Sequence, residues 1–249
     1  MVFHTFGDKE NKAVVLIHGV LCPWQIWNDA IERFKEKYYV IVPELDGHTQ
    51  SEKSTFVSVD DEAVKITEYI RTELGGNVFL LAGLSMGGRI AATAAKSKDI
   101  KIENLVLDGA PLTRINGLMK AVFKKNYKVI IARSKARDPK ILESAKKDFL
   151  PEKMIPFYLD VADNMEEQSI DNMIDTVFTD FNFSGYPDDM RILFMHGTKG
   201  NESVSRKCAV KMKKANPQTE IRCFEGFAHA ELACFKPEQW NDEVERFIS

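Results

Sequence analysis

Short apolar runs alternate along the chain with longer segments that have helical periodicity. Most of the apolar runs are continuous rather than interrupted by polar residues, which is typical of strands covered on both faces of a parallel sheet. Six such runs predict strands at residues 13–17, 38–42, 78–82, 104–108, 191–195 and 219–224. Helices are predicted at residues 27–37, 60–74, 87–97, 204–215 and 237–248. Strands that alternate with helices predict an α/β fold, with a mainly parallel sheet and helices on both of its faces.

The alternation stops between residues 113 and 187. This stretch of 75 residues contains one ambiguous apolar run, residues 129–131, and otherwise predicts several short helices broken at Pro139, Pro151 and Pro156. A loop of this length would be unusual in a compact domain, so we expect a helical insertion. The core would then consist of residues 1–112 and 188–249.

Charge is unevenly distributed within this insertion. Residues 113–150 hold 11 basic and 3 acidic side chains, a net charge of +8, whereas residues 151–189 hold 1 and 10, a net charge of −9. Solvated helix faces with complementary charges would explain this division. A basic half that attracts an anionic substrate would explain it as well.

The overall composition is that of an ordinary globular protein. Of 249 residues, 44% are hydrophobic, and 34 basic against 37 acidic residues give a net charge of −3. A chain of this size can bury a core without disulfides or a metal, and it has no overall positive field to hold a nucleic acid. The four cysteines form no C-x-x-C pair, and the N-terminal segment has no basic stretch followed by an apolar one. We therefore expect a cytoplasmic protein with free thiols and without a membrane span.

A Gly-x-Ser-x-Gly motif follows the third predicted strand. It comprises Gly83, Ser85 and Gly87, and it lies between the apolar run 78–82 and a helix of small residues. This strand–turn–helix setting is typical of a nucleophile elbow, in which a strained turn lifts the serine hydroxyl above the sheet edge. The turn also directs the Met86 amide and the N-terminus of the helix at the same point.

Two histidine loops follow other predicted strands. His18 fits a structural histidine. Two residues later, the Val20 amide is placed to act as the second donor of an oxyanion hole. His229 lies in the loop after the last strand and is the candidate base, because the hydroxyl of Ser85 needs a neighbouring base to become nucleophilic. His196 ends the preceding strand, and we expect it to pack beneath the site.

The order of these motifs resembles that of the α/β-hydrolase superfamily. A strand followed by His18-Gly19, an elbow at Ser85, a helical insertion and Phe-Ala-His229 after the last strand occur in the order of that family. The resemblance covers nearly the whole chain. It implies an α/β-hydrolase fold in which residues 113–187 form a helical lid.

The resemblance also implies roles for single residues. Ser85 would be the nucleophile, His229 the general base, and the amides of Val20 and Met86 the oxyanion hole. The loop at residues 44–51 matches the family's D-x-P-G-x-G-x-S pattern only in part, because an aspartate replaces the proline and a threonine replaces the second glycine.

The acid that would orient the histidine is not fixed by the pattern. Counting forward from Gly197 after the fifth predicted strand, the acid falls on Gly200. Counting back from the next helix, it falls near Asn201 or Glu202, of which only Glu202 carries a carboxylate. Asp108, at the end of the fourth strand, is the alternative, because some members of the family carry the acid there. The absence of an acid is the third possibility.

These features favour a serine hydrolase that cleaves a carboxylic ester or thioester of a small molecule through an acyl-enzyme on Ser85. Such chemistry needs no metal and no organic cofactor. Two alternatives stay open: the run from Ser85 to Arg89 is similar to that of menaquinone-pathway lyases of the superfamily, and the irregular acid loop would suit a non-catalytic binding protein. Aromatic residues of the lid, with Trp24 and Trp27, could line an acyl pocket. The sequence does not indicate the oligomeric state.

Overall fold

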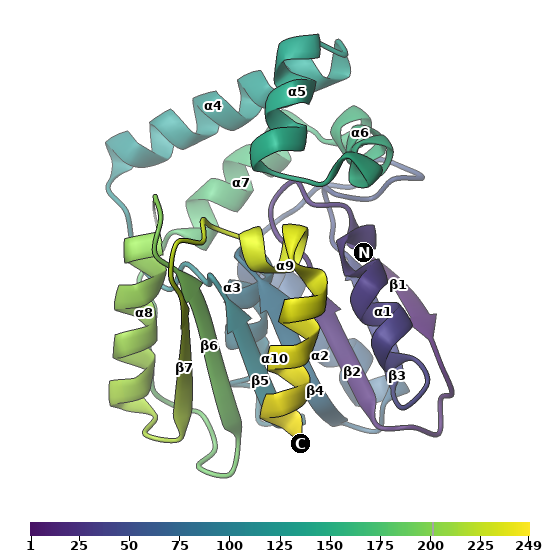
Figure 1. Cartoon of the computed structure of the whole chain (residues 1–249), viewed down its shortest axis with the longest axis vertical. Coiled ribbons are helices and arrows are strands. Elements are labelled where there is room, and N and C mark those ends of the chain that lie inside the picture. Colours follow the sequence, from purple (N-terminus) through teal and green to yellow (C-terminus); the bar gives the residue numbers. More distant parts are fainter. Residues whose placement is uncertain (201) are drawn as a thin grey trace.

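The computed structural model describes residues 1–200 and 202–249, so Asn201 lies outside the described residues. Its centre is a sheet with the strand order β1-β3-β2-β4-β5-β6-β7 (Figure 1). All neighbouring strands are parallel except β1 and β3. The strands span Val2–Phe6 (β1), Ala13–Ile17 (β2), Tyr39–Glu44 (β3), Asn77–Leu84 (β4), Lys101–Asp108 (β5), Arg191–Gly197 (β6) and Thr219–Phe224 (β7). The predicted α/β class and mainly parallel sheet are confirmed.

Strand β1 is the one strand of the described sheet that the apolar runs do not predict. It pairs antiparallel with β3 at the edge of the sheet, with Val2 opposite Glu44 and Phe6 opposite Val40. Its side chains are exposed or half-buried rather than buried on both faces. A search for continuous apolar runs overlooks such an edge strand, because antiparallel strands can face solvent.

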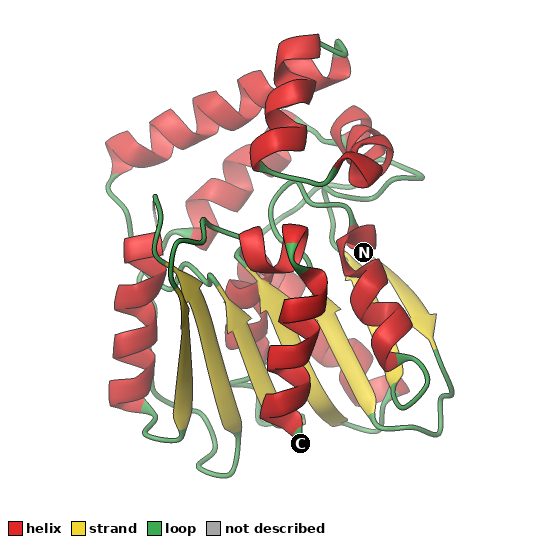
Figure 2. Cartoon of the chain, viewed as in Figure 1, coloured by secondary structure: helices red, strands yellow, loops and turns green. Residues whose placement is uncertain are grey.

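Helices cover both faces of the sheet, as Figures 1 and 2 show. On the near face lie α1 (Asn28–Phe34) and α10 (Pro237–Ile248), and on the far face lie α2 (Val59–Glu73) and α3 (Met86–Ala94). Helix α8 (Glu202–Ala215) packs against β6 and β7. The short helix α9 (Glu231–Phe235) was not predicted, because five residues are too few to show helical periodicity.

Helix α2 illustrates how local sequence sets these elements. The hydroxyl of Ser58 accepts a hydrogen bond from the Asp61 amide at 3.0 Å and so caps the first turn. Three acidic residues in that turn complement the helix dipole. Ala63, Ile66 and Ile70 lie on the buried face, at the spacing that predicted the helix.

Four helices of the inserted segment lie over the carboxyl ends of the strands (Figure 1). They are α4 (Gly117–Lys135), α5 (Pro139–Asp148), α6 (Ile155–Asn164) and α7 (Glu167–Val177), and we call them the lid helices. Pro139 and Pro156 each lie in the first turn of a helix, where proline is tolerated. The ambiguous run 129–131 belongs to α4 and is helical. No helix among the described residues is long and apolar enough to cross a membrane.

The opposite charges of the lid are paired with each other. Lys124 on α4 lies 2.6 Å from the Asp175 carboxylate on α7, and Lys128 lies 2.8 Å from Asp171. Arg137 donates two hydrogen bonds of 2.7 Å to Asp163. These contacts support the interpretation of complementary helix faces, and they leave less positive charge to attract a substrate.

Candidate active site

Ser85 occupies a sharp turn between β4 and α3. Its φ of 54° and ψ of −115° are strained for a non-glycine residue, as a nucleophile elbow requires. Its amide donates a 2.7 Å hydrogen bond to the Asp108 carbonyl, which ties the turn to the end of β5. A Cβ atom at Gly83 would lie 2.2 Å from the Gly87 carbonyl oxygen, and one at Gly87 would lie 2.3 Å from that of Ile17. Both motif glycines are therefore required by close backbone packing.

A chain of hydrogen bonds links Ser85 to His229 and His229 to Glu202. His229 Nε2 lies 2.8 Å from Ser85 Oγ, and its Nδ1 lies 2.6 Å from Glu202 Oε1. The Glu202 side chain is buried at the start of α8, where it also accepts hydrogen bonds from the Gly197 amide at 2.8 Å and the Ser205 hydroxyl at 3.2 Å. The imidazole can thus take the proton of the hydroxyl, while the carboxylate holds the ring in place.

The carboxylate of Glu202 is kept ionised in this buried position. Burial acts to raise its pKa, but the hydrogen bond to His229 and the charge of that ring act to lower it. Hydrogen bonds from the Gly197 amide and the Ser205 hydroxyl act in the same direction, and the net effect lowers the pKa below its ordinary value. An ionised acceptor at Nδ1 is the state that stabilises a protonated imidazole.

Asp108, the other candidate acid, lies beside this chain without joining it. Its side chain is buried, and Oδ2 has no hydrogen-bond partner among the described residues. Burial, followed by the negative charge of Glu202, raises the pKa of Asp108 to about 7. The nearby His229 opposes this rise only in part. The structure therefore brings Glu202, not Asp108, into contact with His229.

The two amides expected to form an oxyanion hole lie on adjoining turns. A Cβ atom at Gly19 would be 3.4 Å from the Cβ of Ser85, so the loop after β2 packs directly against the elbow. Among the described residues, neither the Val20 amide nor the Met86 amide donates a hydrogen bond to the protein. Both N–H groups are consequently free to donate a hydrogen bond to a ligand oxygen.

Two buried histidines hold the loop after β2 in place. His18 donates from Nδ1 to the Gly19 carbonyl at 3.0 Å and accepts at Nε2 from the Leu45 amide at 3.2 Å. His48 accepts at Nε2 from the Leu21 amide at 3.0 Å. Burial lowers the pKa of His18 to about 4 and that of His48 well below its usual range, so both rings stay neutral.

These contacts distinguish the histidines that support loops from His229, which belongs to the hydrogen-bond chain. His18 has the structural role expected of it, and His196 is buried with its Nδ1 2.7 Å from the Gly197 carbonyl. Sequence reasoning missed the support that His48 gives to the loop. The position of His48 in the partly matching loop 44–51 was the available signal, but only the fold shows that this loop lies beside Leu21.

An apolar cavity of about 360 Å³ lies between this loop and the lid helices. Leu21 reaches it from the loop, and residues of α4, α5 and α6, with Phe149 directly after α5, form its other walls. The lining residues are Leu21, Phe123, Asn126, Tyr127, Ile130, Ile141, Ser144, Ala145, Asp148, Phe149 and Tyr158. Trp24 and Trp27 are not among them: Trp24 stacks on His4, and Trp27 packs against Trp240 in the core.

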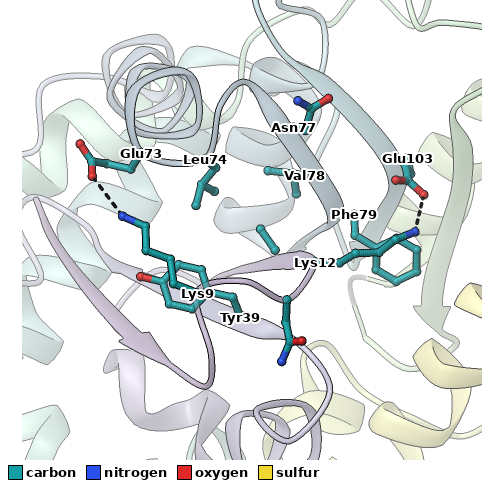
Figure 3. A pocket seen from close by; sticks show the side chains of 11 residues that line it. Lys9, Lys12, Tyr39, Glu73, Leu74, Asn77, Val78, Phe79 and Glu103 are labelled. Atoms are coloured by element: carbon teal, nitrogen blue, oxygen red, sulfur yellow. Dashed lines mark hydrogen bonds and ion pairs between the residues drawn. The ribbon is translucent and has the colours of Figure 1, made fainter.

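A second hollow, of about 290 Å³, lies at the opposite edge of the sheet, near the amino ends of β2 and β4 (Figure 3). Two ion pairs border it, between Lys9 and Glu73 at 3.9 Å and between Lys12 and Glu103 at 3.4 Å. The Lys12 ammonium also lies 4.4 Å from the centre of the Phe79 ring. Because Ser85 follows the carboxyl end of β4, this hollow is separate from the hydrogen-bond chain.

A cluster of carboxylates formed by Asp46, Asp61 and Glu62 has the spacing of a cation site. The Lys65 ammonium contacts all three carboxylates, at 2.5 Å from Asp61 and 3.1 Å from Glu62. Since a protein cation already occupies the centre of this cluster, we assign no metal to it.

Comparison with known proteins identifies the family. The sequence model of the alpha/beta hydrolase fold family matches residues 12–154, more than half of the chain, and the protein belongs to this family. Among curated relatives, the (E)-2-((N-methylformamido)methylene)succinate hydrolase of Acinetobacter baylyi is 29% identical over 126 residues, which are 49% of this chain and 46% of that protein. The chain spans less than half the length of the curated relatives that it matches.

Solved structures share the fold over nearly the full chain. An alpha/beta hydrolase family protein from Desulfitobacterium hafniense has a TM-score of 0.79 at 21% identity, covering 100% of both chains. An esterase from Exiguobacterium antarcticum has a TM-score of 0.74 at 20% identity, covering 99% of this chain and 94% of that one. At such identities the likeness establishes the fold, and the chemistry has to be argued from the site.

Proposed function

We propose that the protein is a serine hydrolase that cleaves a carboxylic ester or thioester through an acyl-enzyme on Ser85. The observation that carries this proposal is the unbroken chain from Glu202 through His229 to Ser85, with hydrogen bonds of 2.6 and 2.8 Å. A hydroxyl, an imidazole and a buried carboxylate in this order are the parts of a nucleophilic triad.

Acylation begins when Ser85 Oγ attacks the acyl carbonyl carbon. His229 Nε2 takes the hydroxyl proton as the Oγ–C bond forms, and the Glu202 carboxylate stabilises the imidazolium through Nδ1. The carbonyl oxygen becomes an oxyanion, which the free amides of Val20 and Met86 stabilise. When the tetrahedral intermediate collapses, the bond to the leaving group breaks and His229 protonates the departing alcohol or thiol.

Deacylation repeats the same steps with water as the nucleophile. His229 takes a proton from the water while the new C–O bond forms, and the bond to Ser85 Oγ breaks as His229 returns that proton to the serine. The carboxylic acid is then released and the triad is restored. The apolar cavity beside Leu21 would hold the acyl chain, since it starts one residue from the Val20 amide.

The two alternative functions have less support. A lyase acting on an anionic substrate would need free positive charge at the site, but Arg89 is buried and donates hydrogen bonds to the Thr179 carbonyl and hydroxyl and to the Asp180 carbonyl. A non-catalytic binding protein would have no need for the strained serine turn, which costs roughly 1–3 kcal/mol of stability.

Labelling with a fluorophosphonate probe, together with hydrolysis of p-nitrophenyl esters, tests the proposal. The wild-type protein should be labelled and should hydrolyse the esters, whereas Ser85→Ala should do neither. Ser97→Ala, a serine just beyond the same helix α3, serves as the matched control and should retain both activities. Absence of labelling in the folded wild-type protein would overturn the proposal, and labelling without turnover of any ester or thioester would favour a different reaction.

A further inference from the structure

Two tyrosines line the apolar cavity between the loop after β2 and the lid helices, Tyr127 on α4 and Tyr158 on α6. The hydroxyl of Tyr158 is paired with the buried Ser134 hydroxyl at 2.7 Å. Among the described residues, the hydroxyl of Tyr127 has no hydrogen-bond partner. A phenol that lines a cavity in this way is free to form a hydrogen bond with a molecule that enters the cavity.

The Tyr127 hydroxyl lies toward the loop end of the cavity. Its side chain is half-buried, and burial, followed by the buried Cys22 thiol, raises the pKa of the hydroxyl. Cys22 directly follows Leu21, which lines the cavity from the loop that carries the Val20 amide. The influence of Cys22 therefore places the phenol on the side of the cavity where an acyl chain would begin. A phenol with a raised pKa stays protonated at neutral pH and can donate a hydrogen bond.

The other polar side chains that line the cavity are in contact with solvent. Asn126 on α4 and Ser144 and Asp148 on α5 are exposed, so they form the outer rim of the cavity, where water solvates them. The apolar lining residues are Leu21, Phe123, Ile130, Ile141, Ala145 and Phe149. Among the described lining residues, the Tyr127 hydroxyl is thus the polar group that a substrate can engage away from solvent.

We propose that Tyr127 selects acyl groups that carry an uncharged oxygen, a hydroxyl or a keto group, close to the reacting carbonyl. This inference rests on the proposed hydrolase function, which places the acyl chain in the cavity. The phenol would donate a hydrogen bond to the oxygen of the chain. A plain alkyl chain would cover the phenol without giving it a partner, and a buried polar group without a partner is costly. The cavity therefore distinguishes oxygenated chains from plain ones.

An uncharged oxygen fits this cavity better than a charged group. Among the described lining residues there is no lysine, arginine or histidine, so a carboxylate on the chain would be buried without a cation. The one carboxylate of the lining, that of Asp148, is exposed at the rim, so an ammonium group beside Tyr127 would also lack a partner. A single neutral donor matches a single neutral acceptor.

Hydrolysis of N-acetylcysteamine thioesters by the full chain tests the proposal. The wild-type protein should hydrolyse the β-hydroxyoctanoyl thioester with a kcat/KM about tenfold above that for the octanoyl thioester. Tyr127→Phe removes only the hydroxyl and should abolish this preference. The ω-hydroxyoctanoyl thioester carries its oxygen at the far end of the chain, so its kcat/KM should depend less on Tyr127.

Tyr158→Phe is the matched control, because it removes a hydroxyl that is already paired with Ser134 from the same cavity. It should change kcat/KM for the octanoyl and β-hydroxyoctanoyl thioesters by the same factor. Circular dichroism should show that both variants are folded. The proposal is overturned if the wild type has no preference for the β-hydroxyoctanoyl thioester, or if Tyr127→Phe leaves that preference in place.

Binding to the Ser85→Ala variant separates this inference from the proposed function. Calorimetric titration with the intact thioesters measures recognition without turnover, and the β-hydroxyoctanoyl thioester should bind about tenfold more tightly than the octanoyl thioester. Adding Tyr127→Phe should remove this difference. Turnover without any preference, in kcat/KM or in binding, would overturn the selectivity of Tyr127 and leave the hydrolase function intact. A binding preference without turnover by the wild type would support the selectivity and contradict the hydrolase function.

Discussion

Glu202 Oε1 lies 2.6 Å from Nδ1 of His229, although the two residues are 27 positions apart in sequence, one at the start of α8 and the other in the loop after β7. The Gly197 amide and the Ser205 hydroxyl hold the same carboxylate, so its orientation is fixed from three sides. Asp108 is also buried, but it makes no hydrogen bond to the imidazole. Sequence spacing left open whether Glu202 or Asp108 lies beside His229, and this contact shows that it is Glu202.

Amide substitution at the two acids should have different effects on catalysis. Glu202→Gln removes the negative charge at Nδ1 and allows the wrong tautomer, so we expect kcat for a p-nitrophenyl ester to fall by about 10²–10⁴. Asp108→Asn should change kcat by no more than a few fold, because its carboxyl does not contact His229. The reverse order of effects would assign the acid to Asp108, and melting curves should show that both variants are folded.

The strands and the serine turn could be predicted because local sequence determines them. Buried parallel strands need continuous apolar runs, and the close approach of Gly83 to Gly87 requires the motif glycines. The edge strand β1 escaped prediction, since a half-exposed strand lacks such a run. The lid was predicted as an insertion, but its first helix, α4, is a continuous helix of 19 residues rather than a short one.

The acid could not be predicted because its role depends on contacts between distant segments. In the sequence, Glu202 has the character of a solvated residue at the start of a helix. In the fold it is 1% exposed, because its carboxylate accepts a hydrogen bond from the Gly197 amide and contacts the His229 ring. Likewise, the support of the Leu21 amide by His48 joins loops 27 residues apart. No local pattern specifies either contact.

Asp108→Asn should stabilise the protein at alkaline pH. Burial raises the pKa of Asp108 to about 7 from an ordinary value near 3.8, so between these values the folded state binds a proton that the unfolded state does not. Stability then falls as pH rises through this window and stays reduced above it. An amide cannot ionise, so the variant should gain up to about 4 kcal/mol over the wild type at pH 8 and much less near pH 4.

Urea denaturation of the wild type and of Asp108→Asn at both pH values measures this difference. Asp188→Asn, at an exposed position, controls for the introduction of an amide. A gain that is the same at both pH values would show that ionisation of Asp108 does not limit stability.

His48 should matter for catalysis through the Leu21 amide. His48→Ala leaves that buried N–H without an acceptor, which should cost about 1–3 kcal/mol of stability and loosen the loop that carries the Val20 amide. We expect kcat to fall about tenfold, because the oxyanion donor loses its fixed position, while KM changes little. His48→Gln places a side-chain carbonyl near the former Nε2 and should restore much of the loss. Equal defects in both variants would argue that the ring is needed for packing alone.

Ala145 should control the length of the acyl chain that the protein accepts. Its side chain is buried on α5 and faces the apolar cavity of about 360 Å³. Ala145→Phe would fill much of this space, so kcat/KM for an octanoyl ester should fall at least about tenfold while that for an acetyl ester stays within a few fold.

Ala145→Leu should have a smaller effect in the same direction and guards against misfolding by overpacking. Lys147→Phe adds the same ring at an exposed position of α5 and should leave the chain-length profile unchanged. If Ala145→Phe lowered turnover equally for all chain lengths, the cavity would not be the acyl site, even though the triad would still stand.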